Sequence, residues 1–197
     1  MSKVQLEVIM AIIFLVPAVT IFKDFTTALM IVNVIIYFKT KFNIFHFSNS
    51  YNKTIAEGNY CRLLTSGFTH ANFLHLLCNL YSINSIVPFL EEVYNKYMIM
   101  IAYFAIMIIG AYLSCRVRGN LRDYSASSVG ASGAICGLFG VVLLLHVDIY
   151  GLQGITSFAP TLILLFIMSF NKNIDSYGHF IGLILGLFAG ALLNLSL

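Results

Sequence analysis

Ser132 is the residue best placed to act as a nucleophile. It lies in the segment GASGAICGLFG, after Gly130 and Ala131 and before Gly133, at the start of a long apolar stretch. Small neighbours leave its hydroxyl uncrowded, and a backbone N–H at a helix N-terminus favours developing negative charge. The segment lacks the G-x-S-x-G elbow of soluble hydrolases, so acyl transfer here depends on a base from elsewhere in the chain.

His179 is the imidazole that could supply this base. It heads the segment HFIGLILGLFAG, in which Gly182, Gly186 and Gly190 follow at intervals of three, four and four residues on one helical face. Glycines at this spacing let two helix backbones touch, and by themselves they need no function beyond packing. A second small-residue stripe follows Ser132, so we expect the two helices to pack together. That stripe consists of Gly133, Gly137 and Gly140.

Polar side chains form a third pattern in the segment ANFLHLLCNLYSINSIVPFL. Asn72, His75, Asn79 and Ser82 recur three, four and three residues apart, which places them on one helical face. Such groups at membrane depth cost on the order of a few kcal/mol, so this stripe must face protein or a water-filled cavity. Hydrogen bonding between helices would explain it without chemistry. Donors to the oxyanion of an acyl-transfer site are the functional alternative.

Membrane-spanning helices are the elements that would position these groups. Hydrophobic residues make up 59% of the 197 positions and charged residues 10%, whereas a soluble domain is roughly 25% charged. A helix needs about 20 mostly apolar residues to cross a bilayer. We therefore predict one all-α domain, a polytopic membrane helical bundle. The clear spans are Ala71–Leu90, Tyr97–Cys115, Ala131–Tyr150, Leu152–Phe170 and Tyr177–Leu197.

The apolar region at 4–38 has two interpretations, because Lys23 and Asp24 interrupt it without a glycine-rich turn. One is a single tilted helix that begins near Pro17, a residue favoured in a first helical turn. The other is an extra N-terminal helix before a span at about 25–43. We favour six core spans and leave the N-terminal segment open. A cleaved signal peptide is not expected, because the start carries little positive charge and no small-x-small site follows.

Helix direction brings the polar clusters to one side of the membrane. One span separates the helices that begin near Ser132 and His179, so these two helices run in the same direction and start at the same depth. The helix that begins at Ala71 lies two spans before the serine and also runs that way. We expect the three clusters to meet at or just beneath one surface, where water can enter.

Charge and cysteine usage argue against other classes of protein. The net charge of +3 is small and scattered, so no nucleic-acid partner is expected. The four cysteines show no metal-ligand spacing and no disulfide framework, and those in apolar spans behave as small hydrophobic residues. We expect no metal and no cofactor. The cysteines are Cys61, Cys78, Cys115 and Cys136.

Four motifs resemble those of the rhomboid proteases in order and spacing, from about Phe25 to the C-terminus. The family's pattern is an Arg-containing first loop, a second helix with His and His-x-x-x-Asn, a fourth with Gly-x-Ser-Gly, and a sixth with His-x-x-Gly-x-x-x-Gly. The matching residues are Arg62, His70, His75, Asn79, Gly130, Ser132, Gly133, His179, Gly182 and Gly186.

The resemblance implies a six-helix rhomboid core, with residues 1–24 as an N-terminal hydrophobic segment and residues 25–197 as the protease membrane domain. It implies an intramembrane serine endopeptidase whose partners are the lipid bilayer and transmembrane protein substrates. Substrates would enter laterally, with the helix at Leu152–Phe170 and the loop before Ser132 as candidate gates. No metal or cofactor would be needed.

The resemblance also assigns roles within the site. Ser132 and His179 would form a catalytic dyad without an acidic third member, with His179 as general base and then acid. The Ser132 N–H and the side chains of His75 and Asn79 would form the oxyanion hole. The other matching residues would support this site: Arg62, His70, Gly130, Gly133, Gly182 and Gly186.

Two cysteines depart from the family's pattern. Cys61 stands before the loop arginine, where many members have Trp, and Cys136 stands four residues after the serine, where an aromatic often packs on the imidazole. The first weakens anchoring of the loop and the second leaves His179 less constrained, but neither removes a reacting group.

Two rival hypotheses are a non-proteolytic rhomboid-like protein that binds transmembrane clients, and a small transporter or channel.

Basic residues concentrate in the loops expected on the active-site side. The positive-inside rule would turn that side towards the cytosol, whereas most of the family has the active site facing away. Orientation and compartment therefore stay open among the secretory pathway, the plasma membrane and an organellar membrane. The basic residues are Lys39, Lys41, Lys53, Arg62, Arg116, Arg118, Arg122 and Lys172.

Overall fold

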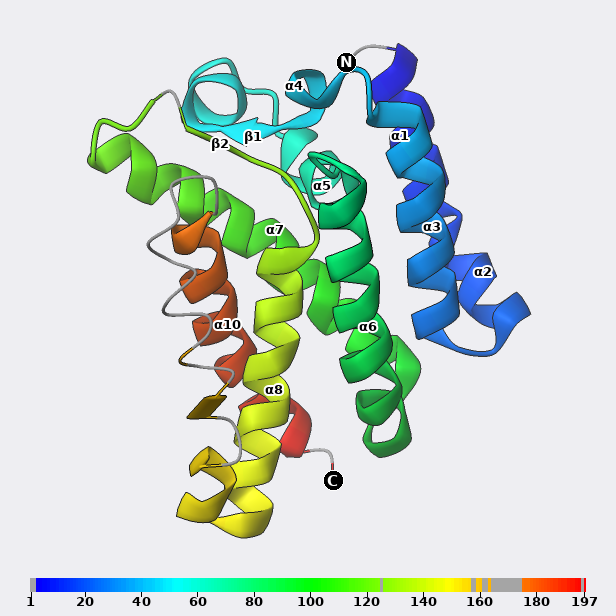
Figure 1. Ribbon diagram of the computed structural model, residues 1–197, viewed down its shortest axis with the longest axis vertical. Coiled ribbons are helices and arrows are strands. Elements are labelled where there is room, and N and C mark those ends of the chain that lie inside the picture. The colour runs from blue at the N-terminus through cyan, green and yellow to red at the C-terminus, as the bar shows by residue number, and fades with distance from the viewer. Residues whose placement is uncertain (1–2, 125, 157–158, 161–162, 164–174, 196) are drawn as a thin grey trace.

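The computed structural model is a bundle of α-helices (Figure 1). It describes residues 3–124, 126–156, 159–160, 163, 175–195 and 197. Within them, five helical segments are long and apolar enough to cross a membrane, which confirms the predicted class of a polytopic all-α membrane bundle. Those segments are Gln5–Phe22, α6 (Phe73–Val93), α7 (Lys96–Asn120), α8 (Ser132–Tyr150) and α10 (Ser176–Asn194).

Four of the five predicted spans coincide with helices α6, α7, α8 and α10, to within a few residues at most ends. The exception is α7, which continues past Cys115 to Asn120 through a stretch that contains two arginines. One of these, Arg118, is buried inside the protein, so its charge does not end the helix. The predicted span at Leu152–Phe170 lies largely outside the described residues.

The N-terminal region forms a separate helical segment before α3. Helices α1 (Lys3–Ile13) and α2 (Leu15–Phe22) lead to a turn at Lys23 and Asp24, and α3 (Phe25–Thr40) follows. Lys23 takes a left-handed conformation with φ of 64°, a rare choice without glycine. Asp24 caps α3 by accepting a hydrogen bond from the Thr27 N–H. The structure thus places a helical segment before the Lys23–Asp24 turn and a second helix, α3, after it.

The polar stretch between α3 and α6 holds short ordered elements. Strand β1 (Asn49–Ser50) pairs antiparallel with β2 (Ser127–Ser128), which lies just before α8. This pairing ties the first long loop to the segment that leads into Ser132. The other short elements are α4 (Ile44–Phe47), η1 (Tyr51–Ala56), α5 (Arg62–Thr65) and η2 (Ser66–Phe68).

Helices α8 and α10 pack backbone to backbone along their glycine stripes. A Cβ added at Gly182 would overlap the carbonyl oxygen of Gly133, and one at Gly186 would overlap the carbonyl oxygen of Gly137. The helices could not approach this closely with any larger residue at these positions. The predicted pairing of the two small-residue stripes is therefore present, and it sets the distance between the first turns of α8 and α10.

Candidate active site

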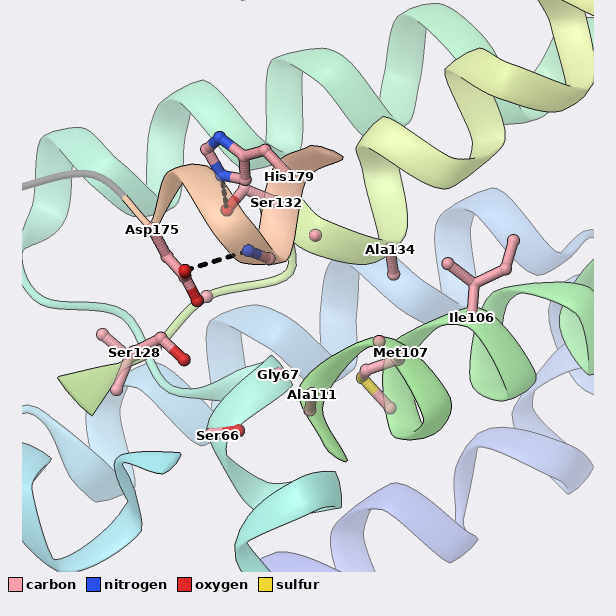
Figure 2. A pocket seen from close by; sticks show the side chains of 15 residues that line it. Ser66, Gly67, Ile106, Met107, Ala111, Ser128, Ser132, Ala134, Asp175 and His179 are labelled. Carbon is pink, nitrogen blue, oxygen red and sulfur yellow. Dashed lines mark hydrogen bonds between the residues drawn. The ribbon is translucent and has the colours of Figure 1, made fainter. Parts of the chain in front are cut away.

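Ser132 and His179 lie side by side at the starts of α8 and α10 (Figure 2). The His179 Nε2 atom is 2.8 Å from the Ser132 Oγ atom, and both side chains are partly buried. In the tautomer with the proton on Nδ1, Nε2 accepts the hydroxyl hydrogen. This is the contact that activation of a serine by a neighbouring base requires.

The backbone register of α8 against α10 explains this contact. Gly182 follows His179 by one turn and faces the carbonyl of Gly133, the residue after Ser132. The next close approach, of Gly186 to Gly137, lies one turn further along both helices. The two parallel glycine contacts thus fix the depth of both side chains, and the pair meets as the sequence predicts.

His75 reaches the same region from the first turn of α6. Its backbone N–H donates to the side chain of Asn72, which caps this helix. Its ring lies against Gly130, where an added Cβ would be 2.6 Å from the His75 Cε1 atom. Gly130 also has a φ of +113°, which strongly favours glycine, and its N–H donates to the Ser66 carbonyl at 2.9 Å. Only glycine fits this position, because of its positive φ and because a side chain would collide with the His75 ring.

Asn79 lies one turn beyond His75 on α6 and is buried. Its side-chain amide donates to the His75 carbonyl at 2.8 Å, within its own helix. The structure therefore brings His75 to the Gly130 segment but uses the Asn79 donor elsewhere. The role of Asn79 in an oxyanion hole stays a prediction.

His70 supports His75 from the loop before α6. It is fully buried, and the two imidazole rings meet edge to face with centroids 5.2 Å apart. Burial lowers the pKa of His70 to about 3, with a smaller contribution from His75, so the His70 ring is neutral at ordinary pH. A neutral, packed ring restricts where His75 can lie.

Arg62 supports the site through the first long loop. It is buried at the start of α5 and donates through Nη1 to the carbonyls of Phe45 and Ser48, at 3.0 and 2.7 Å. Burial lowers its pKa, an effect that Glu57 partly offsets. Because Ser48 precedes strand β1, which pairs with β2, Arg62 is connected to the segment that carries Gly130.

The two cysteines that depart from the family's pattern lie near α5 and on α8. Cys61 is partly buried directly before α5, and Cys136 is buried on α8, one turn after Ser132. Neither cysteine forms a disulfide with another cysteine of the described residues. Among the residues that the structure describes, no group of three or more His, Cys, Asp or Glu side chains could hold a metal ion.

Asp175 is a residue near the site that the sequence interpretation missed. It lines a small cavity together with Ser132 and His179 (Figure 2), and it caps α10 by accepting the Gly178 N–H at 2.9 Å. Burial alone would raise the pKa of this carboxyl, but Arg118 and the Gly178 hydrogen bond outweigh it and keep the pKa below its usual value. An Asp directly before an apolar helical stretch is a typical N-cap signal, and Asp175 could have been found that way.

Fold and site together define a multi-pass membrane protein with a serine–histidine pair at the heads of two parallel helices. Comparison with known proteins identifies the family. The family model of the rhomboid domain matches residues 57–195, and the chain belongs to the rhomboid family of intramembrane serine proteases.

Several named relatives cover much of this chain. YdcA of Bacillus subtilis (strain 168), named as a candidate rhomboid protease, is 36% identical over 142 residues, which are 68% of this chain and 67% of the relative. Rhomboid-like protease 2 of Toxoplasma gondii is 32% identical over 71% of this chain and 50% of its own length. RHOMBOID-like protein 5 of Arabidopsis thaliana is 32% identical over 73% and 47%. The chain therefore spans about half the length of the last two relatives.

Proposed function

We propose that this chain is an endopeptidase that cleaves transmembrane segments of membrane proteins through a Ser132–His179 dyad. The observation that carries the proposal is the 2.8 Å contact between the His179 Nε2 and Ser132 Oγ atoms at the heads of two membrane-spanning helices. Membership of the rhomboid family supports the same reaction class.

In the proposed reaction, His179 takes the hydroxyl proton as the Ser132 Oγ atom attacks the scissile carbonyl carbon. The resulting oxyanion forms next to the Ser132 N–H, which lies in the first turn of α8, where backbone donors have no partner within the helix. The imidazolium then gives its proton to the leaving amine. A water molecule, activated by the same imidazole, hydrolyses the acyl-enzyme and restores the serine.

The side chains of His75 and Asn79 complete the proposed oxyanion hole. His75 needs little movement because its ring already lies against Gly130, two residues before Ser132. Asn79 must exchange its bond to the His75 carbonyl for one to the oxyanion. If Asn79 makes that exchange, Asn79→Ala lowers kcat by about 10²- to 10³-fold, the usual effect of losing one oxyanion donor. An unchanged kcat would limit Asn79 to the hydrogen bond within α6.

The test is cleavage of a model single-pass substrate by purified protein reconstituted in lipid vesicles. Ser132→Ala and His179→Ala should each abolish cleavage. Ser85→Ala and His146→Ala are matched controls, because Ser85 is exposed on α6 and His146 is near the far end of α8. Both controls should retain cleavage. Undiminished cleavage by either dyad variant would refute the dyad. Folded wild-type protein that neither cleaves the substrate nor reacts with a fluorophosphonate would favour a client-binding scaffold or a channel.

A further inference from the structure

The first turn of α10, which carries His179, is held by Asp175. One carboxylate oxygen of Asp175 accepts the Gly178 N–H at 2.9 Å, and the Asp175 carbonyl accepts the His179 N–H at 3.1 Å. The side chain and the backbone of this one residue therefore fix the start of the helix on which the base is carried. Any contact that holds Asp175 in place therefore also holds the first turn of α10, from which the His179 side chain projects.

Arg118, in the last turn of α7, binds the same carboxylate. Its Nη2 atom donates to the Asp175 Oδ1 atom at 2.7 Å, and the two side chains are only 10% and 16% exposed. Ser114, one turn earlier on α7, places its hydroxyl 3.4 Å from both carboxylate oxygens. A pair this buried is screened little by water, and removing one partner leaves an uncompensated charge inside the protein.

Further contacts join the Arg118–Asp175 pair to neighbouring segments. Ser128, from strand β2, lines the same small cavity as Asp175, and its side chain helps to lower the pKa of that carboxyl. The guanidinium of Arg118 lies 5.8 Å from the ring centroid of Tyr177, in the first turn of α10. The pair thus connects α7 to the start of α10, near the segment before Ser132, and in the view of Figure 2 Asp175 lies between Ser128 and the dyad.

A second acidic group near Arg118 does not share this position. The Asp123 Oδ2 atom lies 3.9 Å from the Arg118 Nη1 atom, but its side chain is 44% exposed. The Asp123 backbone N–H donates to the Arg118 carbonyl, within the turn that ends α7. Asp123 therefore offers a matched comparison, because it contacts the same arginine without capping α10.

We propose that Arg118 and Asp175 are positioning residues that hold the His179 imidazole against the Ser132 hydroxyl by fixing the first turn of α10 to α7. This inference rests on the proposed dyad. Within the described part of the chain, neither side chain hydrogen-bonds to the Ser132 hydroxyl or the His179 ring. Asp175 lies one turn before His179, and the Arg118 side chain binds Asp175 and lies near Asp123 and Tyr177. On this proposal, the position of His179 depends on the Arg118–Asp175 pair as well as on the glycine packing of α10 against α8.

The experiment compares kcat and KM of reconstituted variants on the model single-pass substrate. Asp175→Asn retains a capping oxygen and loses the charge, Arg118→Gln loses the cation, and Arg118→Lys keeps it. We expect the first two variants to lower kcat by about 10- to 100-fold, because a base displaced by a fraction of an ångström to 1 Å loses this much, with KM within about threefold of wild type.

The conservative and double variants separate positioning from folding. Arg118→Lys should recover most of the lost kcat, and the Arg118→Gln/Asp175→Asn double variant should be no slower than the slower single variant, since both changes break one interaction. The control variants Asp123→Asn and Arg116→Gln, both at more exposed positions, should stay within about twofold of wild type in kcat. Rates are divided by the fraction of enzyme that a fluorophosphonate labels at saturation.

Two results would overturn the inference. One is a wild-type kcat per labelled enzyme in Asp175→Asn and Arg118→Gln, with only the yield of folded protein reduced. The other is a loss of kcat in Asp123→Asn equal to that in Asp175→Asn. Failure of the proposed function is a distinct outcome, in which wild-type protein and the Ser132→Ala variant cleave equally or not at all.

Discussion

Replacing Gly182 with alanine should separate the dyad without touching either reacting residue. A methyl group on Gly182 would lie 3.0 Å from the carbonyl carbon of Gly133 and closer still to its oxygen, whereas ordinary contact begins at 3.4 Å. The neighbouring atoms are backbone, so they cannot rotate away as a side chain would. The methyl group must therefore push α10 away from α8.

The expected loss follows from the size of this displacement. Relieving the overlap needs a separation of about 1 Å, and the His179 Nε2 to Ser132 Oγ distance of 2.8 Å would then exceed hydrogen-bonding range. A misplacement of about 1 Å costs on the order of 10²-fold in rate. We expect kcat of Gly182→Ala to fall by about that factor, with destabilisation of about 1–3 kcal/mol from overpacking.

The assay measures kcat on a transmembrane substrate in lipid vesicles, and thermal unfolding in detergent checks folding. Gly190→Ala is the matched control on the same helix, because its nearest neighbour is the Val141 Cα atom at 3.2 Å and a shift of a few tenths of an ångström suffices. It should keep kcat within about threefold of wild type. Folded Gly182→Ala enzyme with wild-type kcat would refute the claim that backbone contact sets the geometry of the dyad.

Three further predictions concern the residues around the dyad. Gly130→Ala should lower kcat/KM by more than about tenfold, because it combines a φ of +113° with a Cβ 2.6 Å from the His75 ring; wild-type kcat/KM would contradict this. Arg62→Gln should destabilise the fold by about 2 kcal/mol and lower Tm by roughly 4–8 °C, because two carbonyls lose a buried charged donor; an unchanged Tm in a thermal scan would contradict it. His70 has a folded-state pKa of about 3 against a usual value of 6.5, so the unfolded state takes up its proton first as pH falls. Its contribution to stability should be fully present above pH 6.5 and should decrease by about 1.4 kcal/mol per unit towards pH 3. His70→Phe should remove that part of the pH dependence of Tm, and an identical slope in both proteins would show that the ring is not buried neutral.

Much of the membrane architecture could be predicted from the sequence because bilayer thickness dictates helix length. The apolar stretches that end near Leu90 and Tyr150 coincide with α6 and α8, since each has enough apolar residues to cross and a polar boundary at both ends. The contact between Ser132 and His179 was also predictable, because the glycine stripes that follow them can pack only in a narrow range of registers.

Features decided by tertiary contacts could not be predicted in this way. The turn at Lys23 uses a left-handed lysine, and α3 begins there because the Glu91 carboxylate on α6 accepts the Phe25 and Thr26 N–H groups. Helix α7 runs past Cys115 because Asp175, distant in sequence, neutralises Arg118. These partners lie about 60 residues apart in the chain, so no local pattern indicates them.

The most direct test of the central claim is to locate the adduct that a fluorophosphonate forms on the folded, reconstituted protein. Intact-mass and peptide mass spectrometry should find one phosphonyl group, on Ser132, in the wild type. The His179→Ala variant should show none on the same timescale, because its serine lacks a base. Labelling of Ser132 at an equal rate in wild type and His179→Ala, or an adduct on a different serine, would contradict the dyad.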